Sequence, residues 1–285
     1  MKYLDSFFLP TRDKEASYLY PTKYPFGFFS EKELSDVYFA DITIIYGSNG
    51  SGKSTLLNII NNKLEFARKS VFYEEEAFRD YMKRCYYKLA VGDNGKEIKI
   101  PLHSKMIASE DIINFIFSIR NKNIQSEELK QKLIEEYQST KFTPFRYEGF
   151  VDYESLVKKT ETQRTTQTKY IEKRVKFLKQ FSNGENVLRY FDSELENDGL
   201  YLLDEPENCL SPKFQLELAD LIQKCTRYCG CQFVIATHSP FLLSLPGAKI
   251  YNLDIIPVAI CKWTELENVR IYHEFFQKFS EEFTE

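Results

Sequence analysis

The 285-residue sequence lacks the features that mark membrane and secreted proteins. No apolar run approaches the roughly 18 uncharged residues that cross a bilayer, so no membrane-spanning helix is expected. The segment Met1–Asp5 already contains an acid and precedes no apolar signal-peptide core, so no secretory signal is predicted. The net charge of −4 gives no overall basic field that would attract nucleic acid. We therefore predict a cytoplasmic protein without direct membrane insertion.

Cysteine and histidine are too few and too scattered for a common kind of zinc site. Three of the six cysteines lie close together, Cys225, Cys229 and Cys231, but they form no C-x-x-C pair, and the chain has only three histidines. Structural zinc sites usually combine such pairs with each other or with histidines. We expect reduced, buried cysteines, as is usual in cytosolic proteins. No constellation typical of a nuclease appears either.

Aromatic and charged side chains are abundant. The 24 phenylalanines and 19 tyrosines contribute to a hydrophobic share of 43%, beside 28% charged residues, which is typical of a globular protein with a large core. The segment from Tyr24 to Phe39 is predicted to supply edge strands. Within it, Tyr24 or Phe26 would either lie against an adenine or pack in the core.

The glycine-rich segment Gly47–Thr55 organises the chain. It follows the apolar run Ile42–Tyr46 and precedes a helical pattern that starts at Leu56. This strand–loop–helix context supports the G-x-x-x-x-G-K-[ST] match, in which backbone N–H groups surround a phosphate and the helix N-terminus adds positive charge. Lys53 would reach the β- and γ-phosphates of a nucleotide. The residues predicted to bind the phosphates are Gly47, Asn49, Gly50, Gly52, Lys53, Ser54 and Thr55.

Two further apolar runs end in residues that can perform chemistry. Leu200–Asp204 is followed by Glu205, and Gln232–Thr237 is followed by His238. In phosphate-loop enzymes, a strand of the first kind is expected beside the phosphate-loop strand, with its carboxylates over the phosphates. The second run ends at the sheet edge where α/β proteins bind ligands. We therefore predict that Glu205 and His238 are catalytic, with Glu205 acting on the attacking water, and that Ser54 and Asp204 bind Mg²⁺.

Turn and cap residues divide the remaining chain. Asp93-Asn94-Gly95 predicts a hairpin turn between strands at 87–91 and 98–100. Helix starts are predicted at Ser109, at Ser126 and at Ser211-Pro212, the last with an end near Gly230. Further helices are expected over residues 70–90, with Phe72, Ala77, Tyr81 and Cys85 on one face, and from about Tyr153 to Phe181.

Residues 120–180 are polar and mostly helical, without an internal repeat or a low-complexity linker. Two explanations of their positive charge stay open: a solvated helix face, or a surface for nucleic acid or an acidic partner. The predicted organisation is a core of residues 1–110 and 182–285 with an inserted helical lobe of residues 111–181. The basic residues in question are Lys158, Lys159, Arg164, Lys169, Lys173, Arg174, Lys176 and Lys179.

In this order, four motifs resemble those of ABC-type ATPases. They are the phosphate loop, Phe181–Glu185, Leu202–Glu207 and Thr237–Pro240, and they span residues 41–245. The set is most similar to the small stand-alone bacterial ATPases grouped with RecF- and SMC-like heads, often labelled AAA family ATPases. The resemblance implies an α/β fold: a mixed, mainly parallel sheet flanked by helices, with an antiparallel β subdomain and an inserted helical lobe.

The resemblance also implies a homodimer that closes head to head on two Mg²⁺–ATP complexes. Ser182, Gly184 and Glu185 would form the signature that one subunit presents to the γ-phosphate held by the other's Lys53. His238 would sense that phosphate, and residues 208–211 would form the D-loop across the interface. No Q-loop glutamine is found, and the role of residues 109–111, near its expected place, stays open.

Together these features predict an ATP-hydrolysing dimer that switches a partner protein or a DNA or RNA complex through its helical lobe. A defence or toxin-type ATPase that controls an effector encoded elsewhere would be a special case. The alternative is a nucleotide-binding subunit of a membrane transporter. The signature reads Ser-Asn-Gly-Glu from Ser182 onward, instead of the transporter-type Ser-Gly-Gly-Gln, and this argues against that alternative.

Overall fold

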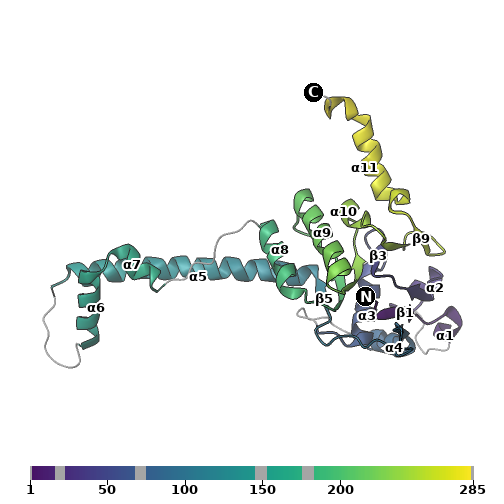
Figure 1. Ribbon diagram of the computed structural model, residues 1–285, viewed down its shortest axis with the longest axis horizontal. Helices are drawn as coiled ribbons and strands as arrows, with labels where there is room; N and C mark the ends of the chain where they lie inside the picture. The colour runs from purple at the N-terminus through teal and green to yellow at the C-terminus, as the bar shows by residue number, and fades with distance from the viewer. Residues whose placement is uncertain (1, 17–22, 68–74, 145–152, 175–182, 284–285) are drawn as a thin grey trace. The chain divides into compact units, whose positions relative to one another are not determined.

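The computed structural model describes residues 2–16, 23–67, 75–144, 153–174 and 183–283. The chain divides into two compact units, a core unit of Met1–Ile113 and Asn183–Glu285 and a helical unit of Asn114–Ser182. The core unit combines a six-stranded sheet, a three-stranded antiparallel sheet and helices (Figure 1). This confirms the predicted fold class, including its antiparallel β part and its inserted helical segment.

The six-stranded sheet is parallel except for its last strand. Most residues of its central strands are buried and apolar, as expected where helices cover both faces of a parallel sheet. The order is β5 (Lys105–Ala108), β6 (Leu200–Asp204), β7 (Gln232–Ala236), β3 (Ile42–Tyr46), β8 (Lys249–Asn252) and the antiparallel β9 (Ala259–Cys261).

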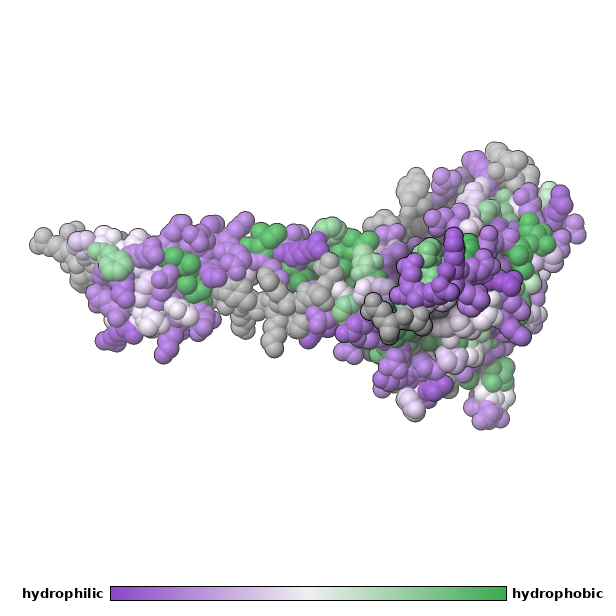
Figure 2. Space-filling model, turned by 90° about the horizontal axis from the view of Figure 1, so that it is seen from above, coloured by the Kyte–Doolittle hydropathy of each residue, from purple (hydrophilic) through white to green (hydrophobic). Residues whose placement is uncertain are grey.

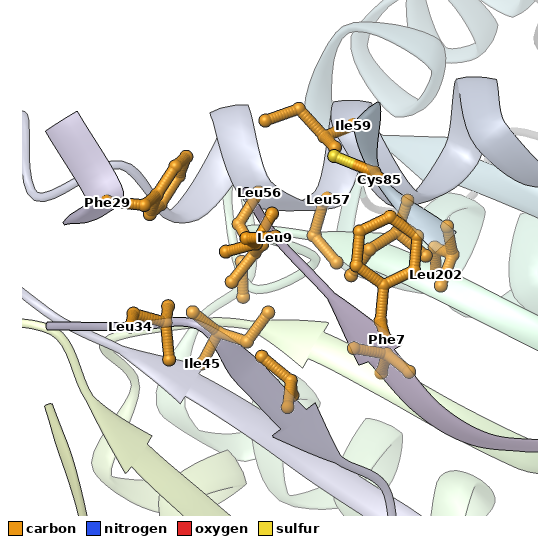
Figure 3. Close-up of a cluster of buried hydrophobic side chains, with 14 of the residues drawn as sticks. Phe7, Leu9, Phe29, Leu34, Ile45, Leu56, Leu57, Ile59, Cys85 and Leu202 are labelled. Atoms are coloured by element: carbon orange, nitrogen blue, oxygen red, sulfur yellow. The ribbon is translucent and has the colours of Figure 1, made fainter. Parts of the chain in front are cut away.

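Helix α3 (Lys53–Leu64) forms the centre of the hydrophobic core. Figure 3 shows Leu56, Leu57 and Ile59 of this helix above Ile45 and Leu202 of the sheet. All five side chains are almost completely buried. Burial of each stabilises the fold by about 1.5–3 kcal/mol. Because α3 packs over β6 and β7 as well as following β3, its N-terminus is directed towards the ends of those strands.

The three-stranded sheet has the order β2–β1–β4, with β1 (Leu4–Phe8) in the middle. Edge strands were predicted between Tyr24 and Phe39, and within this range the structure has one, the edge strand β2 (Asp36–Tyr38). The prediction was wrong for residues 28–31, because a positive φ of 81° at Gly27 turns the chain into the short helix α2 (Phe28–Glu31), which buries Phe29. Helix α1 (Arg12–Ala16) precedes it.

The helix predicted over residues 70–90 is shorter than expected. Helix α4 (Glu76–Arg84) buries Ala77 and Tyr81, but the chain becomes extended at Cys85 and continues as β4 (Tyr86–Leu89). Pairing of β4 with β1 outweighs helix formation there. Phe72 lies outside the described residues.

The predicted hairpin turn is present, but its second strand is not. Gly92 N–H donates to the carbonyl of Lys96 at 2.9 Å, and Gly95 has a φ of 72°. Beyond the turn only one bridge forms, between Val91 and Glu97, and residues 98–100 are not part of a strand.

Helix α5 (Ser109–Phe142) begins at the predicted serine but does not restart at Ser126. The Ser126 hydroxyl donates to the carbonyl of Lys122 at 2.8 Å within the helix, so this serine is not an N-cap. The single helix expected from Tyr153 is also divided. Helix α6 (Tyr153–Arg164) ends before Thr166, which caps α7 (Gln167–Glu172) by accepting from the Lys169 N–H.

The helical unit has a small core of its own, in which Leu133, Tyr137, Tyr170 and Ile171 are buried together. Among the described residues, no helix is both long and apolar enough to span a membrane. Figure 2 shows that hydrophilic residues cover most of one face of the molecule and that hydrophobic side chains form small groups on it. The remaining helices are α8 (Asn183–Glu194), α9 (Pro212–Tyr228), α10 (Pro240–Leu243), α11 (Glu267–Lys278) and the 3₁₀ turns η2 (Trp263–Glu265) and η3 (Ser280–Phe283).

Candidate nucleotide-binding site

The phosphate loop connects β3 to α3 as the sequence predicts. Gly50 and Gly52 have φ angles of 80° and 99°, which are accessible to glycine and strained for other residues. Lys53 is 5% exposed, and its Nζ atom donates to the carbonyls of Gly47 at 2.8 Å and Ser48 at 3.2 Å. The lysine thus folds back over the loop, with its charge inside the bend that is predicted to receive phosphate. Asn49 and Gly50 are exposed at the tip of the loop, and Thr55 follows Ser54 in the first turn of α3.

Ser54 and Asp204 meet at the carboxyl edge of the sheet. The Ser54 hydroxyl donates to Asp204 Oδ1 at 2.9 Å, although 150 residues separate them in the chain. The sequence-based expectation that β6 lies directly beside β3 is wrong, because β7 lies between them. The two residues still meet because α3 crosses over β7 towards β6.

Asp204 is a suitable ligand for a divalent cation. Burial raises the pKa of Asp204 to about 6, while the hydrogen bond from Ser54 lowers it and the nearby carboxylates of Glu205 and Glu110 raise it. A cation beside this side chain would compensate for the lost hydration. Oxygen ligands from a carboxylate and a hydroxyl suit Mg²⁺, which usually completes its shell with water and substrate phosphates. These residues therefore fit Mg²⁺ bound together with a nucleotide.

Glu205 has an unusual backbone conformation, with a φ of 46°, at the start of the segment after β6. Such a conformation is uncommon for a residue with a side chain and is often found at functional sites. Its Oε1 atom lies 3.7 Å from Lys53 Nζ and 3.8 Å from His238 Nδ1. Asn208 Nδ2 donates to Oε2 at 3.2 Å. The structure thus brings three predicted site residues together, and Asn208 of the predicted D-loop joins them.

His238 lies two residues after the end of β7, with 45% of its side chain exposed. Its backbone carbonyl accepts a hydrogen bond from Asn268 Nδ2 of α11 at 2.7 Å. The imidazole lies beside Glu205 after the carboxyl end of this strand.

The predicted signature is only partly within the described residues. Ser182 lies outside them, whereas Gly184 is buried and Glu185 is exposed in the first turn of α8. A side chain at Gly184 would overlap the ring of Phe214 in α9, so this glycine permits the close approach of the two helices. A role of these residues towards a second subunit remains a prediction.

The two aromatic candidates for adenine binding have different environments. Phe26 is buried and packs edge to face against Tyr81 at 5.1 Å, so its ring belongs to the core. Tyr24 is 51% exposed, and its hydroxyl forms a hydrogen bond with Thr55 Oγ1 of the phosphate-loop helix.

Residues 109–111, near the expected Q-loop position, follow β5 directly. Ala108 is the register partner of Asp204, which explains the electrostatic influence of Glu110 on Asp204. Asp111 Oδ2 accepts from the Ala108 N–H at 3.0 Å, which fixes the start of α5.

Two acids of the site were missed in the sequence. Asp254 follows β8 and accepts hydrogen bonds from the Ser48 N–H at 2.8 and 2.9 Å and from its hydroxyl at 2.8 Å. An acid just after an apolar strand is the signal that could have identified it, as it identified Asp204. A hollow of about 370 Å³ lies beside Asp254 and is lined further by His238, Asn268 and Tyr272.

The second missed acid, Glu207, is buried beside the segment that contains His238.

All six cysteines are free thiols. Cys85 and Cys231 are buried and three others are partly buried, but the expectation of burial was wrong for Cys209, which is exposed. Cys209 lies in the turn before α9, and its exposure follows from that position. In the described part of the chain, no group of three or more histidine, cysteine or acidic side chains could hold a metal ion by itself.

A family of known proteins matches most of the chain. The sequence model of one family, described as "AAA domain, putative AbiEii toxin, Type IV TA system", matches residues 42–244. This confirms the resemblance predicted from the four motifs. A comparison with curated proteins found no significant match.

Solved structures similar to this chain include SMC head domains and an ATP-binding cassette. The Smc head domain with an extended coiled coil bound to the C-terminal domain of ScpA, from Pyrococcus furiosus, has 15% identity and a TM-score of 0.44, covering 96% of this chain and 100% of that chain. The SMC head domain from Thermotoga maritima has 15% identity and a TM-score of 0.42, covering 92% and 99%. An ATP-binding cassette bound to ADP and Pi has 19% identity and a TM-score of 0.35, covering 77% and 84%.

Proposed function

The chain belongs to this family of AAA domains, and from that premise we propose that it is an ABC-type ATPase that binds and hydrolyses Mg²⁺–ATP. The observation that carries the proposal is the hydrogen bond between Ser54 and Asp204. It joins the phosphate loop to the strand-end acid at the point where a metal–nucleotide complex would bind. The ATP phosphates would lie against the backbone of Gly47, Asn49, Gly50, Gly52, Lys53, Ser54 and Thr55.

Three side chains have distinct roles in the proposal. Lys53 would exchange its carbonyl contacts for the β- and γ-phosphates and stabilise their charge. Glu205 would orient the attacking water and accept its proton. His238, at the open edge beside Glu205, would donate a hydrogen bond to the γ-phosphate.

Mg²⁺ held by Ser54 and Asp204 would neutralise phosphate charge. Tyr24, exposed beside Thr55, is the proposed contact for the adenine.

We further propose an ATP-dependent homodimer. In it, Ser182, Gly184 and Glu185 of one subunit would face the nucleotide of the other, and residues 208–211 would cross the interface.

The exposed face of α11 supports such an interface, because Ile271, Tyr272, Phe275 and Phe276 of this helix are each at least half exposed. A contiguous apolar patch of this kind usually marks a contact surface. Ile271 and Tyr272 also line the hollow beside the phosphate loop, so a second copy bound there would adjoin the nucleotide.

Switching of a partner is the proposed output. The helical lobe of residues 111–181 would contact an effector protein or nucleic acid, and the core of residues 1–110 and 182–285 would bind ATP. The description of the family as a toxin supports the special case in which the partner belongs to a defence or toxin system. Ion pairs already occupy several basic side chains of the lobe, since Lys173 and Arg174 both pair with Glu161.

The test of the ATPase proposal is direct measurement of ATP binding and phosphate release by the purified chain. Lys53→Ala should weaken ATP binding by about tenfold or more, because a charge-assisted contact to phosphate is worth about 1.5–3 kcal/mol. Lys63→Ala, at the other end of α3, is the matched control and should leave affinity unchanged. Equal affinity of the wild type and Lys53→Ala would refute the assignment of the phosphate loop.

A further inference from the structure

Glu207 is a buried carboxylate with no part in the chemistry proposed above. It lies two residues after Glu205, and only 5% of its surface is exposed. Burial of a carboxylate is costly unless hydrogen bonds compensate for the lost water. Its contacts should therefore explain why an acid is present at this position.

Within the described residues, the side-chain hydrogen bonds of Glu207 lead to one short segment. Oε1 accepts from Thr237 Oγ1 at 2.6 Å, from the His238 N–H at 3.0 Å and from the Ser239 N–H at 3.2 Å. The three donors are consecutive residues that follow β7. Because hydrogen bonds to a charged acceptor are stronger than neutral ones, this single oxygen fixes the backbone of the segment.

The segment that Glu207 holds contains the histidine of the site. The side chain of His238 is 45% exposed, so packing alone does not fix it. Its backbone is held from two sides: Glu207 accepts from the N–H, and the carbonyl accepts from Asn268 Nδ2. The 3.8 Å separation between His238 Nδ1 and Glu205 Oε1 therefore depends on where Glu207 places this segment.

We propose that Glu207 is a positioning residue that holds His238 beside Glu205 for ATP hydrolysis. This inference rests on the proposed ATPase function. The role requires a hydrogen-bond acceptor of the right reach, and a side-chain amide oxygen can replace the carboxylate oxygen in it. Glu207→Gln thus retains the role, Glu207→Ala removes it, and Glu207→Asp withdraws the acceptor by one methylene.

Steady-state ATPase kinetics of the full chain test the proposal. Glu207→Ala should lower kcat on the order of 100-fold with little change in KM, because displacement of a catalytic group by about 1 Å costs about that much. Glu207→Gln should stay within about threefold of the wild type. An equal loss in Glu207→Gln and Glu207→Ala would overturn the proposal, and so would a raised KM with an unchanged kcat.

A double-mutant cycle identifies the residue through which Glu207 acts. If Glu207 acts through His238, the double variant Glu207→Ala/His238→Ala should be no slower than His238→Ala alone. Losses that multiply in the double variant would overturn the proposal. If Glu207→Ala does not fold, the same cycle is measured with Glu207→Asp, for which the same lack of additivity is expected.

Gln215 of α9 offers a matched control. Its Oε1 accepts from Ser239 Oγ at 2.6 Å, so Gln215→Ala removes a contact to the same segment without affecting the bonds of Glu207. We expect kcat of this variant within about threefold of the wild type. A loss as large as that of Glu207→Ala would indicate general loosening of the segment and contradict a specific role of Glu207.

Amide hydrogen exchange provides a readout that needs no turnover. The amides of His238 and Ser239 should exchange faster in Glu207→Ala than in the wild type and should stay protected in Glu207→Gln and Gln215→Ala. A wild-type protein that hydrolyses no ATP would contradict the proposed function, and the exchange experiment would still decide the positioning role. Unchanged protection in Glu207→Ala would overturn it.

Discussion

Glu205 is the residue at which binding and hydrolysis can be separated. Its carboxylate lies near Lys53 and His238, but it is not one of the two proposed Mg²⁺ ligands. Glu205→Gln should therefore bind ATP within a few-fold of the wild-type affinity, while kcat falls by about 10²–10⁴-fold, the usual contribution of a general base. Phosphate release and equilibrium nucleotide binding measure the two quantities.

Glu217 on the exposed side of α9 provides the control for that substitution. Glu217→Gln makes the same chemical change on a side chain that is 45% exposed, and its only ion pair among the described residues is with Lys213 at 4.0 Å. Its turnover should match the wild type. Normal turnover in Glu205→Gln would remove Glu205 from the mechanism and leave the strain at its backbone without a catalytic explanation.

Helices α8 and α9 approach each other closely at Gly184, and this contact predicts an effect on stability. A methyl group at Gly184 would overlap the ring of Phe214, and overpacking of this kind costs about 1–3 kcal/mol. The higher helix propensity of alanine offsets about 1 kcal/mol of this cost. Gly184→Ala should therefore lower the free energy of unfolding by up to about 2 kcal/mol, as measured by urea denaturation.

A second substitution separates packing from the predicted signature role. In the background Phe214→Ala, the same Gly184→Ala change should cost less stability, because the ring that it meets is gone. If Gly184 acts only in packing, ATPase activity should change little between Phe214→Ala and the double variant. Activity that is lost in spite of recovered stability would support a contact of Gly184 with the nucleotide of a second subunit.

At the scale of elements, the sequence predicts best where one local rule operates. The apolar runs that became β3, β6 and β7, and the serine–proline start of α9, are each specified by their own residues. The pairing of β4 with β1, about eighty residues away in the chain, could not be predicted, because no local pattern reveals such a distant partner. The expectation that β6 lies directly beside β3 was wrong for a similar reason. The connection between two parallel strands does not determine how many strands it crosses, and here β7 lies between them.

The candidate site shows the same limit. Ser54, Asp204, Glu205 and His238 could be identified because each follows an apolar run or belongs to a known motif. Glu207 could not, because its role lies in hydrogen bonds to Thr237, His238 and Ser239, some thirty residues away, and a buried acid looks like any surface acid in the sequence.

The helical lobe allows a test of nucleic-acid binding at the scale of the whole molecule. Lys158 is paired with Glu136, and Arg174 with Glu161, so part of the positive charge seen in the sequence is neutralised. If the lobe binds DNA or RNA, affinity should fall steeply with salt, and the log–log slope should decrease by about one for each phosphate contact removed.

Two pairs of substitutions make this test specific. Arg164→Gln and Lys169→Gln change basic side chains for which no ion pair is found among the described residues. They should reduce the slope more than Lys158→Gln and Arg174→Gln, whose charges are already paired. Fluorescence anisotropy with labelled duplex DNA and RNA over a salt series measures the slopes. Absence of binding at low salt would favour the explanation of a solvated face.

The proposed dimer can be tested through Phe275 and Phe276 of α11, neither of which is assigned to chemistry. Burial of four half-exposed apolar side chains on each copy would remove about 800 Å² from water in total, since an aromatic side chain buries about 150–250 Å². That is less than the roughly 1,000 Å² expected of a specific interface, so this face alone should not hold a dimer, and ATP should be needed as well. Because Glu205→Gln should bind ATP without hydrolysing it, we expect this variant to accumulate the proposed dimer in ATP. Phe275→Ser/Phe276→Ser in the same background should abolish that dimer, while ATP affinity stays normal. Light scattering with and without ATP measures this, and a dimer that persists in the double-serine variant would place the interface elsewhere.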